Sequence, residues 1–307
     1  MKKHAITLLT LLCALRAPAQ LPSAGSGTVQ RFENFPSRYV AARNVDVWLP
    51  DGYTARKRYA VLYMHDGQML FDSMRNWNGQ EWQVDETAGR LLRERKIRDV
   101  IVVGIWNTGL SRHTEYFPQK AFEALPLPLR DSLYKKFGSG ENDLFYRKQV
   151  QSDAYLKFLV EELKPFVDSV FTTRKERENT FIAGSSMGGL ISMYAICEYP
   201  EVFGGAACLS THWPGLFVAE DNPVPQAILA YLQSRLPDPK THRFYFDLGS
   251  VELESWYPPF QKQADEILRA GGYSRKNWQT RVFPGENHSE RAWAKRLEIP
   301  LVFLLGR

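Results

Sequence analysis

Cysteine is scarce in this 307-residue sequence, which contains only Cys13, Cys197 and Cys208. Cys197 and Cys208 both lie in apolar segments, so small buried thiols are the favoured interpretation. Their spacing does not decide whether they form a disulfide, which an oxidising compartment would permit. The six histidines are far apart, and no Cys pair or His-x-x-x-His helix accompanies them. Because ligand spacings of that kind are missing, the sequence predicts no metal site.

The chain also lacks a strong charge bias once its first residues are set aside. Its formal net charge is +5, but residues 1–19 hold three basic and no acidic residues, which leaves about +2 for the rest. Basic residues elsewhere alternate with acidic ones, as in 174–178, a pattern typical of a solvated turn. We therefore expect no nucleic-acid partner.

No apolar run is long enough to cross a membrane as a helix, which takes about 20 residues. The run at 5–15 follows Lys2 and Lys3 and precedes small residues at 17–19, which is the pattern of a secretory signal peptide. An uncleaved membrane anchor is the alternative, whereas the leucines before Cys13 argue against lipidation. We predict cleavage after Ala19 and an exported protein, periplasmic or extracellular, without a membrane span.

The remaining residues, 20–307, contain no internal repeat and no linker, and their number suits one large domain. Short β-branched and aromatic runs alternate with helical patterns. The expected strands cover residues 45–49, 59–64, 100–106, 180–183, 205–210, 244–248 and 278–283. The expected helices cover residues 81–94, 152–170, 188–198, 257–270 and 290–305. This alternation predicts an α/β fold, with a mostly parallel central sheet and helices on both faces.

One long segment, residues 107–150, interrupts the alternation and carries three prolines. It follows an expected strand, so it should emerge at the carboxyl edge of the sheet, where open α/β folds bind ligands. Loops of this length are usually lids, binding loops or disordered segments, and the aromatic residues here favour a packed one. We expect an active-site loop or lid.

A nucleophile motif occurs at 184–188, where the sequence reads Gly-Ser-Ser-Met-Gly. An expected strand precedes it and an expected helix follows, which is the setting of a Gly-x-Ser-x-Gly nucleophile elbow in an α/β-hydrolase fold. Glycines at 184 and 188 let the two backbones of this strained turn approach each other. Only Ser186 has a glycine two residues away on both sides, which excludes Ser185, and a phosphate loop would need other spacings and a lysine. Ser186 is the predicted nucleophile.

A serine hydroxyl needs a base, and in this fold the chain order is Ser, acid, His. His288 follows the last expected strand and precedes the last helix, so it meets both the order and the geometry. The other histidines lie in the leader, before Ser186, directly after the next strand, or at the wrong end of a strand: His4, His65, His113, His212 and His242. His288 is therefore the predicted base, the alternative being a solvated loop histidine.

The acid should lie in the loop after the strand at 244–248. Asp247, Glu252 and Glu254 compete for the role of orienting the imidazole and stabilising its cation. Asp247 is closest to the strand and could satisfy the turn instead, while at least one of the glutamates is expected to be solvated. The residues alone do not separate the three.

Two backbone N–H groups are expected to stabilise the oxyanion. Met187, directly after the nucleophile, supplies one of them. Gln68, in the loop after the strand at 59–64, is the expected second donor, and Gly67 should let the backbone turn inward there. Local turn chemistry is the preferred role for the neighbouring His65 and Asp66.

The sequence resembles the "putative esterase" family of α/β-hydrolases in three places. These are residues 63–68, residues 184–190, and the segment from His288 to Glu290 with Trp293 and Arg296-Leu297. That family is similar to esterase D, the feruloyl and acetylxylan esterases, the enterochelin esterases and the mycolyltransferases. The resemblance covers nearly all of the chain after residue 19. It implies a Ser–acid–His triad containing Ser186 and His288, with no metal and no organic cofactor.

The resemblance also bears on the acid and the substrate pocket. Some relatives have an aspartate where Glu254 stands and others place the acid at Glu252; we prefer Glu254, whose neighbours keep the closer register. His212 and Trp213 resemble a recurring segment beside the active site, so they are expected to line the acyl or alcohol pocket, with packing of the next loop as the alternative. Arg112 and its neighbours Glu115 and Tyr116 are similar to relatives too.

The resemblance implies a secreted serine esterase that forms an acyl-enzyme and acts on acyl esters of carbohydrates. Three alternatives stay open: opening of a siderophore lactone, acyl transfer of the mycolyltransferase type, and non-catalytic carbohydrate binding. The expected partner is therefore a small-molecule or polysaccharide ester.

Overall fold

The computed structural model describes residues 21–138, 144–145 and 149–307. The expected signal peptide lies outside these residues and stays a prediction. Within the described ranges, the model contains no helix that is both long and apolar enough to span a membrane. Cys197 and Cys208 are both buried free thiols, as their apolar surroundings indicated.

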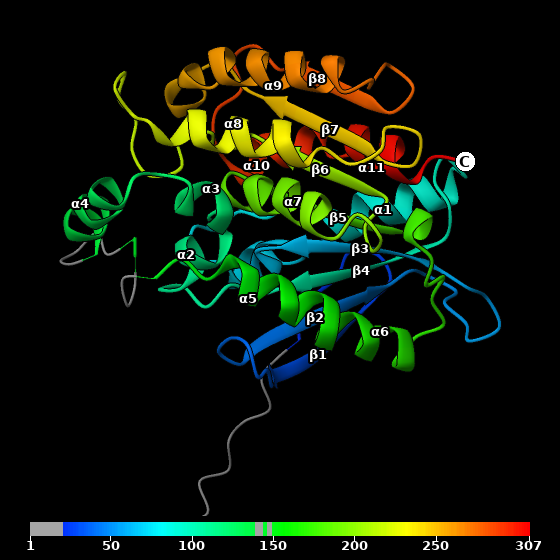
Figure 1. Cartoon of the computed structure of the whole chain (residues 1–307). Helices are drawn as coiled ribbons and strands as arrows, with labels where there is room; N and C mark the ends of the chain where they lie inside the picture. Colours follow the sequence, from blue (N-terminus) through cyan, green and yellow to red (C-terminus); the bar gives the residue numbers. More distant parts are fainter. Residues whose placement is uncertain (1–20, 139–143, 146–148) are drawn as a thin grey trace, which may run out of the picture.

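A central eight-stranded sheet organises the molecule (Figure 1). The strands are β1 (Thr28–Phe35), β2 (Arg43–Leu49), β3 (Ala60–His65), β4 (Val100–Ile105), β5 (Thr180–Ser185), β6 (Gly205–Leu209), β7 (Arg243–Leu248) and β8 (Trp278–Val282). Their order is β1-β2-β4-β3-β5-β6-β7-β8. The pairs that involve β1 or β2 are antiparallel and all others are parallel. The six parallel strands therefore end at one edge of the sheet.

Helices cover both faces of the sheet (Figure 1). They are α1 (Val84–Arg93), α2 (Arg112–Tyr116), α3 (Gln119–Glu123), α4 (Leu127–Phe137), α5 (Ser152–Lys157), α6 (Lys164–Val170), α7 (Met187–Glu198), α8 (Val224–Arg235), α9 (Pro258–Ala270), α10 (Glu290–Arg296) and α11 (Glu298–Leu305). One apolar core lies between the sheet and α1, α10 and α11. A larger core on the other face includes residues of α5 to α9. The predicted α/β architecture is confirmed.

Prolines divide two of the expected helices. The helix expected at 152–170 consists of α5, a π-helical turn at Phe158–Leu163, and α6, in which Pro165 has no N–H to donate to the preceding turn. The helix expected at 290–305 is separated into α10 and α11, with Pro300 in the first turn of α11, where proline is tolerated.

Strand β1 and helix α8 are not among the expected elements. In β1, only Val29 is buried and the other side chains are partly or fully exposed, as suits an edge strand with little apolar periodicity. Helix α8 directly follows Pro223 and carries Pro225 in its first turn, where proline is tolerated.

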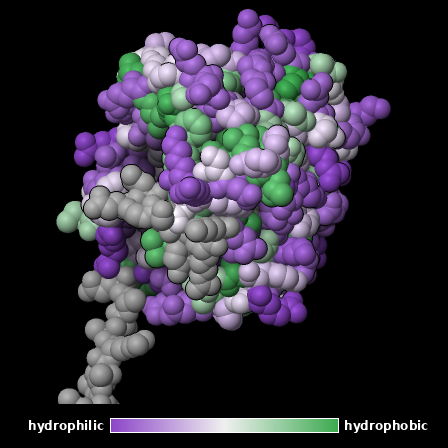
Figure 2. Space-filling view, turned by 60° about the vertical axis from the view of Figure 1, so that its left-hand side comes forward, coloured by the Kyte–Doolittle hydropathy of each residue, from purple (hydrophilic) through white to green (hydrophobic). Residues whose placement is uncertain are grey.

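The segment 107–150 is not a structureless loop where it is described. It contains α2, α3 and α4, and the side chains of Phe117, Phe122 and Phe145 are fully buried and pack on one another. This bears out the packed alternative that its aromatic residues favoured. Figure 2 looks toward the carboxyl edge of the sheet and shows a mostly hydrophilic surface with separate hydrophobic patches.

Candidate active site

Ser186 stands on a strained turn between β5 and α7. Its backbone has φ 58° and ψ −123°, a conformation that residues with a side chain rarely adopt. The turn is held by hydrogen bonds: the Ser186 N–H donates to the Leu209 carbonyl at 3.0 Å. A Cβ on Gly184 would lie 2.8 Å from the carbonyl of Gly188, so this glycine is required by the close approach of the helix. The predicted elbow is present.

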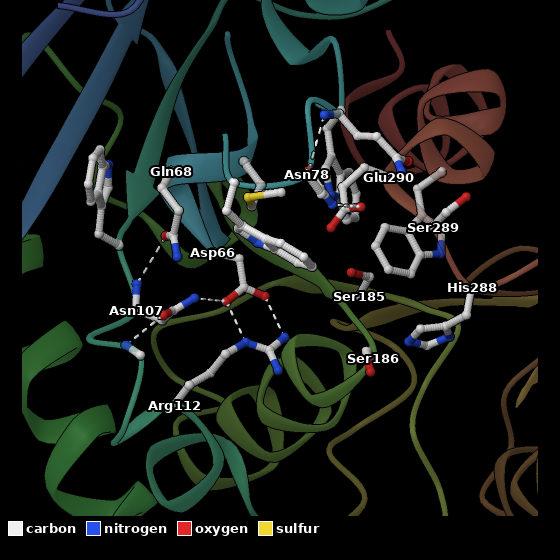
Figure 3. A pocket seen from close by; sticks show the side chains of 17 residues that line it. Asp66, Gln68, Asn78, Asn107, Arg112, Ser185, Ser186, His288, Ser289 and Glu290 are labelled. Atoms are coloured by element: carbon white, nitrogen blue, oxygen red, sulfur yellow. Dashed lines mark hydrogen bonds and ion pairs between the residues drawn. The ribbon is translucent and has the colours of Figure 1, made fainter. Parts of the chain in front are cut away.

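His288 lies in the loop between β8 and α10, and its Nδ1 is 2.9 Å from the Oε1 of Glu254. The ring packs edge-on against Trp293, with centroids 5.1 Å apart, and its side chain is 17% exposed. A hydrogen bond from Nδ1–H to the carboxylate leaves Nε2 as the acceptor nitrogen of a neutral imidazole. Figure 3 shows this ring turned toward Ser186, and both residues line one cavity.

Glu254 is fully buried in a short 3-10 helix, Glu252–Trp256, after β7. Its second oxygen accepts the N–H of Gly249 at 2.8 Å. Burial by itself would raise the pKa of Glu254, but hydrogen bonds to His288, Ser210 and the Gly249 N–H outweigh burial and lower it. The carboxylate is therefore charged near neutral pH, and its charge faces the imidazole.

The two competing acids lie elsewhere. Asp247 is fully buried, but it forms an ion pair with Arg296 at 2.9 Å and accepts the N–H of Ser210. Glu252 is exposed and begins the 3-10 helix with φ 54°. Among the three carboxylates that the sequence left open, the structure brings Glu254 to His288 and gives the other two different surroundings.

The expected oxyanion donors, Met187 and Gln68, lie at the start of α7 and in the 3-10 turn Gly67–Met69 after β3. N–H groups in the first turn of a helix have no acceptor within that helix, so they are available to a ligand. Gly67 plays a different role from the expected one. Its φ is not in the left-handed region; a Cβ there would lie 2.4 Å from the backbone of Gly104, so Gly67 permits close contact with β4.

The left-handed residue of this turn is Asp66, with φ 56°. Its carboxylate accepts two hydrogen bonds from Arg112, at 2.8 and 2.7 Å, and one from Asn107 at 2.8 Å (Figure 3). Burial alone would raise the pKa of Asp66, but the Arg112 charge and these hydrogen bonds hold it below its usual value. This ion pair ties the turn before Gln68 to α2. Before the structure, the only indication that Arg112 matters was its similarity to residues of related sequences.

These elements enclose one cavity of about 820 Å³. Its lining combines tryptophan rings with amide, carboxylate and hydroxyl side chains, among them the hydrogen-bonded group of Asp66, Asn107 and Arg112 (Figure 3). The lining residues are Asp66, Gln68, Met69, Trp77, Asn78, Gln80, Trp82, Trp106, Asn107, Gly109, Arg112, Ser185, Ser186, His288, Ser289, Glu290 and Trp293. The described part of the chain holds no group of three His, Cys, Asp or Glu residues suited to a metal ion.

His212 and Trp213 occupy different environments. The backbone N–H of His212 donates to the Ser186 carbonyl at 3.2 Å, and its Nδ1 is 2.8 Å from the hydroxyl of Tyr257. Burial and then the nearby His288 lower the pKa of His212 to about 3, so its ring is neutral. His212 is not among the residues that line the cavity, so its expected substrate-binding role stays a prediction.

Trp213 does not reach the cavity. Its side chain is fully buried, stacks on Phe246 and donates its indole N–H to Gln261 at 3.1 Å. A substrate-binding role was expected for it; the ring instead fills the core beside α9, because its apolar area and polar N–H are both satisfied there. The position of Trp213 therefore agrees with the alternative of a packing role.

Comparisons with known proteins give a family match and show which known proteins this chain resembles. The chain matches the family model described as "Putative esterase" over residues 38–298. An endo-1,4-beta-xylanase/feruloyl esterase of Xylanibacter ruminicola is 25% identical over 283 residues, which span 89% of this chain and 30% of that protein. The uncharacterized protein YbbA of Bacillus subtilis is 22% identical over 273 residues, 86% of this chain and 93% of that one.

Solved structures share the fold. A ferulic acid esterase from Anaeromyces mucronatus superposes with a TM-score of 0.60 at 18% identity, covering 93% of this chain and 92% of its own. The ferric enterobactin esterase from Salmonella typhimurium has a TM-score of 0.63 at 19% identity, covering 92% and 59%. These likenesses confirm the expected α/β-hydrolase fold.

Proposed function

This chain belongs to the esterase family that its residues 38–298 match, and from that premise we propose that it is a serine carboxylic-ester hydrolase working through an acyl-enzyme. The observation that carries the proposal is the placement of three groups. A serine on a strained elbow shares a cavity with a histidine whose other nitrogen is held by a buried carboxylate. This is the arrangement by which a weak hydroxyl nucleophile is activated.

In the first half of the reaction, the Oγ of Ser186 attacks the ester carbonyl carbon while Nε2 of His288 takes the hydroxyl proton. The carbonyl π bond opens to a tetrahedral oxyanion. When that intermediate collapses, the bond to the alcohol oxygen breaks, and His288 returns its proton to the leaving alcohol. Water then repeats the sequence on the acyl-enzyme, which releases the carboxylic acid and restores Ser186.

Glu254 keeps the imidazole in the productive tautomer and stabilises the imidazolium formed at each proton transfer. Its burial makes this effect strong, because a carboxylate without competing water interacts more strongly with the imidazolium cation. The Gly249 N–H holds its second oxygen, which fixes the carboxylate plane.

The oxyanion is proposed to be stabilised by the backbone N–H groups of Met187 and Gln68. Met187 begins α7, so its N–H lies at the positive end of the helix dipole, directly after Ser186. The bidentate Asp66–Arg112 pair preserves the position of the second donor because it anchors the turn that contains Gln68. Removing one such donor costs on the order of 10²–10³ in kcat in a serine hydrolase.

We propose acyl esters of carbohydrates as the substrates. Aromatic rings beside amide and carboxylate groups suit molecules that have both apolar faces and hydroxyl edges, and this cavity combines the two. A relative described as a feruloyl esterase supports the same class. Export through a cleaved leader at 1–19 belongs to the proposal, since such esters are extracellular polymers.

The test is release of p-nitrophenol from p-nitrophenyl acetate by the wild type and by Ser186→Ala. We expect turnover by the wild type, a fall of at least about 10³ in kcat for the variant, and fluorophosphonate labelling of the wild type only. Equal turnover by both proteins, with no labelling of either, would refute a serine mechanism. Comparing feruloylated, acetylated and siderophore esters then decides the substrate class.

A further inference from the structure

Trp77 is the most exposed aromatic side chain among the large hydrophobic residues that the structure describes. It is 88% exposed, and it is also one of the residues that line the cavity of Ser186. Its indole makes no ring contact and no hydrogen bond within the described part of the chain. An exposed aromatic ring that also lines a reaction cavity is available to contact a bound ligand.

The other tryptophans of the cavity are fixed on several sides. Trp82 and Trp293 pack against each other with centroids 5.3 Å apart, and both are nearly buried. Trp106 donates its N–H to Asp46 at 2.9 Å and lies under the guanidinium of Arg31. These rings form the wall of the site, whereas Trp77 offers a free aromatic face.

The backbone around Trp77 is fixed, although its side chain is exposed. The Gly79 N–H donates to the Asn76 carbonyl at 3.1 Å, and the Asn76 side chain donates to the carbonyl of Gln80. The Asn78 side chain donates to Glu290 at 3.0 Å, which fastens this loop to the first residue of α10 (Figure 3). The loop is therefore anchored two residues from the histidine of the triad.

The surroundings of Trp77 fit a sugar ring. A pyranose has an apolar C–H face, which stacks on an indole, and hydroxyl groups at its edge, which need hydrogen-bond partners. Asn78, Gln80 and Glu290 line the cavity next to Trp77 and supply amide and carboxylate groups at its edge.

The same surroundings disfavour a lipid surface. A membrane-binding face needs a continuous apolar area, whereas Asn78, Gln80 and Glu290, which line the cavity with Trp77, are polar or charged.

We propose that Trp77 forms an accessory subsite that stacks on a pyranose ring of the polysaccharide chain bearing the ester. The subsite holds the chain at the cavity entrance so that an acyl branch enters toward Ser186. This rests on the proposed esterase function and narrows its substrate to polymer-linked esters.

The experiment compares Trp77→Ala, Trp77→Tyr and the control Met74→Ala on acetylated xylan, acetylated glucomannan and p-nitrophenyl acetate. Met74 is 92% exposed in the same loop region but does not line the cavity. We expect Trp77→Ala to raise KM for a polymer roughly three- to tenfold more than for p-nitrophenyl acetate, with kcat on the polymer little changed. Trp77→Tyr should restore most of the loss, and Met74→Ala should change neither substrate. An equal change on all three substrates would overturn the proposal.

A binding measurement separates this proposal from the esterase function. Ser186→Ala, which cannot turn over, should be retarded in native gels containing either polymer, and the double variant with Trp77→Ala should lose that retardation. The subsite would be overturned if the double variant were retarded as strongly as Ser186→Ala. It would also be overturned if Trp77 were needed for binding to vesicles of phosphatidylcholine and phosphatidylglycerol instead of to the polymers. If no ester is hydrolysed but the retardation depends on Trp77, the esterase function fails while the subsite stands.

Discussion

Replacing Glu254 by Gln removes the one carboxylate that the structure places on Nδ1 of His288, at 2.9 Å. The carboxylate has two acceptor oxygens in use, one for the imidazole and one for the Gly249 N–H at 2.8 Å. Glutamine keeps only one acceptor oxygen. If its amide NH₂ faces the ring, His288 must carry its proton on Nε2, and that tautomer cannot take the proton of Ser186.

The magnitude follows from the charge and the tautomer. A hydrogen bond to a charged group is worth about 1.5–3 kcal/mol, so its loss when the imidazolium forms lowers kcat about 10- to 150-fold. Populating the wrong tautomer adds to this, and the comparable Asp→Asn change in a serine protease lowers kcat by about 10⁴. We therefore expect kcat of Glu254→Gln to fall between about 10² and 10⁴, with KM nearly unchanged.

The assay is steady-state hydrolysis of p-nitrophenyl acetate at pH 7.5, with Glu252→Gln as the matched control. Glu252 is exposed in the same 3-10 helix, so its variant should keep kcat within about threefold. Circular dichroism should show both variants folded. A folded Glu254→Gln that retains more than a third of the activity, or a large loss at Glu252 instead, would refute the assignment of the acid.

Three further outcomes follow. Gly184→Ala should destabilise the fold by about 1–3 kcal/mol in urea unfolding and lower kcat, because its Cβ would meet the Gly188 carbonyl at 2.8 Å; an unchanged variant would contradict the elbow's packing. Because folding lowers the pKa of Glu254 below its usual value of 4.5, the ionised carboxylate stabilises the folded state at any pH above 4.5. The free energy of unfolding of the wild type should therefore exceed that of Glu254→Gln at pH 6, and the difference should shrink as the pH falls below 4.5. A difference that grows in acid would contradict this. Trp213→Phe should lower the free energy of unfolding by about 1–3 kcal/mol, because the buried Gln261 oxygen loses its hydrogen-bond donor, and it should leave KM unchanged. A raised KM would show that Trp213 contacts the substrate after all.

Much of the fold could be predicted from the sequence because its buried strands are short, continuous apolar runs. Strands β2 to β7 fall within a few residues of their expected bounds, and so does the edge strand β8, although its side chains are partly or fully exposed. Edge strand β1 escaped prediction because only one face of it touches the core and its side chains are mostly exposed. The expected helices at 152–170 and 290–305 were undivided because their apolar periodicity continues past Pro165 and Pro300, in the first turns of α6 and α11.

By itself, the sequence predicted the nucleophile and base positions, since each is specified by local pattern and chain order: glycines on both sides of Ser186, and one histidine after the last expected strand. The residues alone left the acid open, and the family resemblance favoured Glu254. Asp247, Glu252 and Glu254 are neighbours in sequence, and only the 3-10 helix after β7 turns Glu254 inward while Arg296 engages Asp247. The tertiary structure likewise placed Trp213 in the core and exposed Trp77 at the cavity, because burial depends on partners distant in the chain.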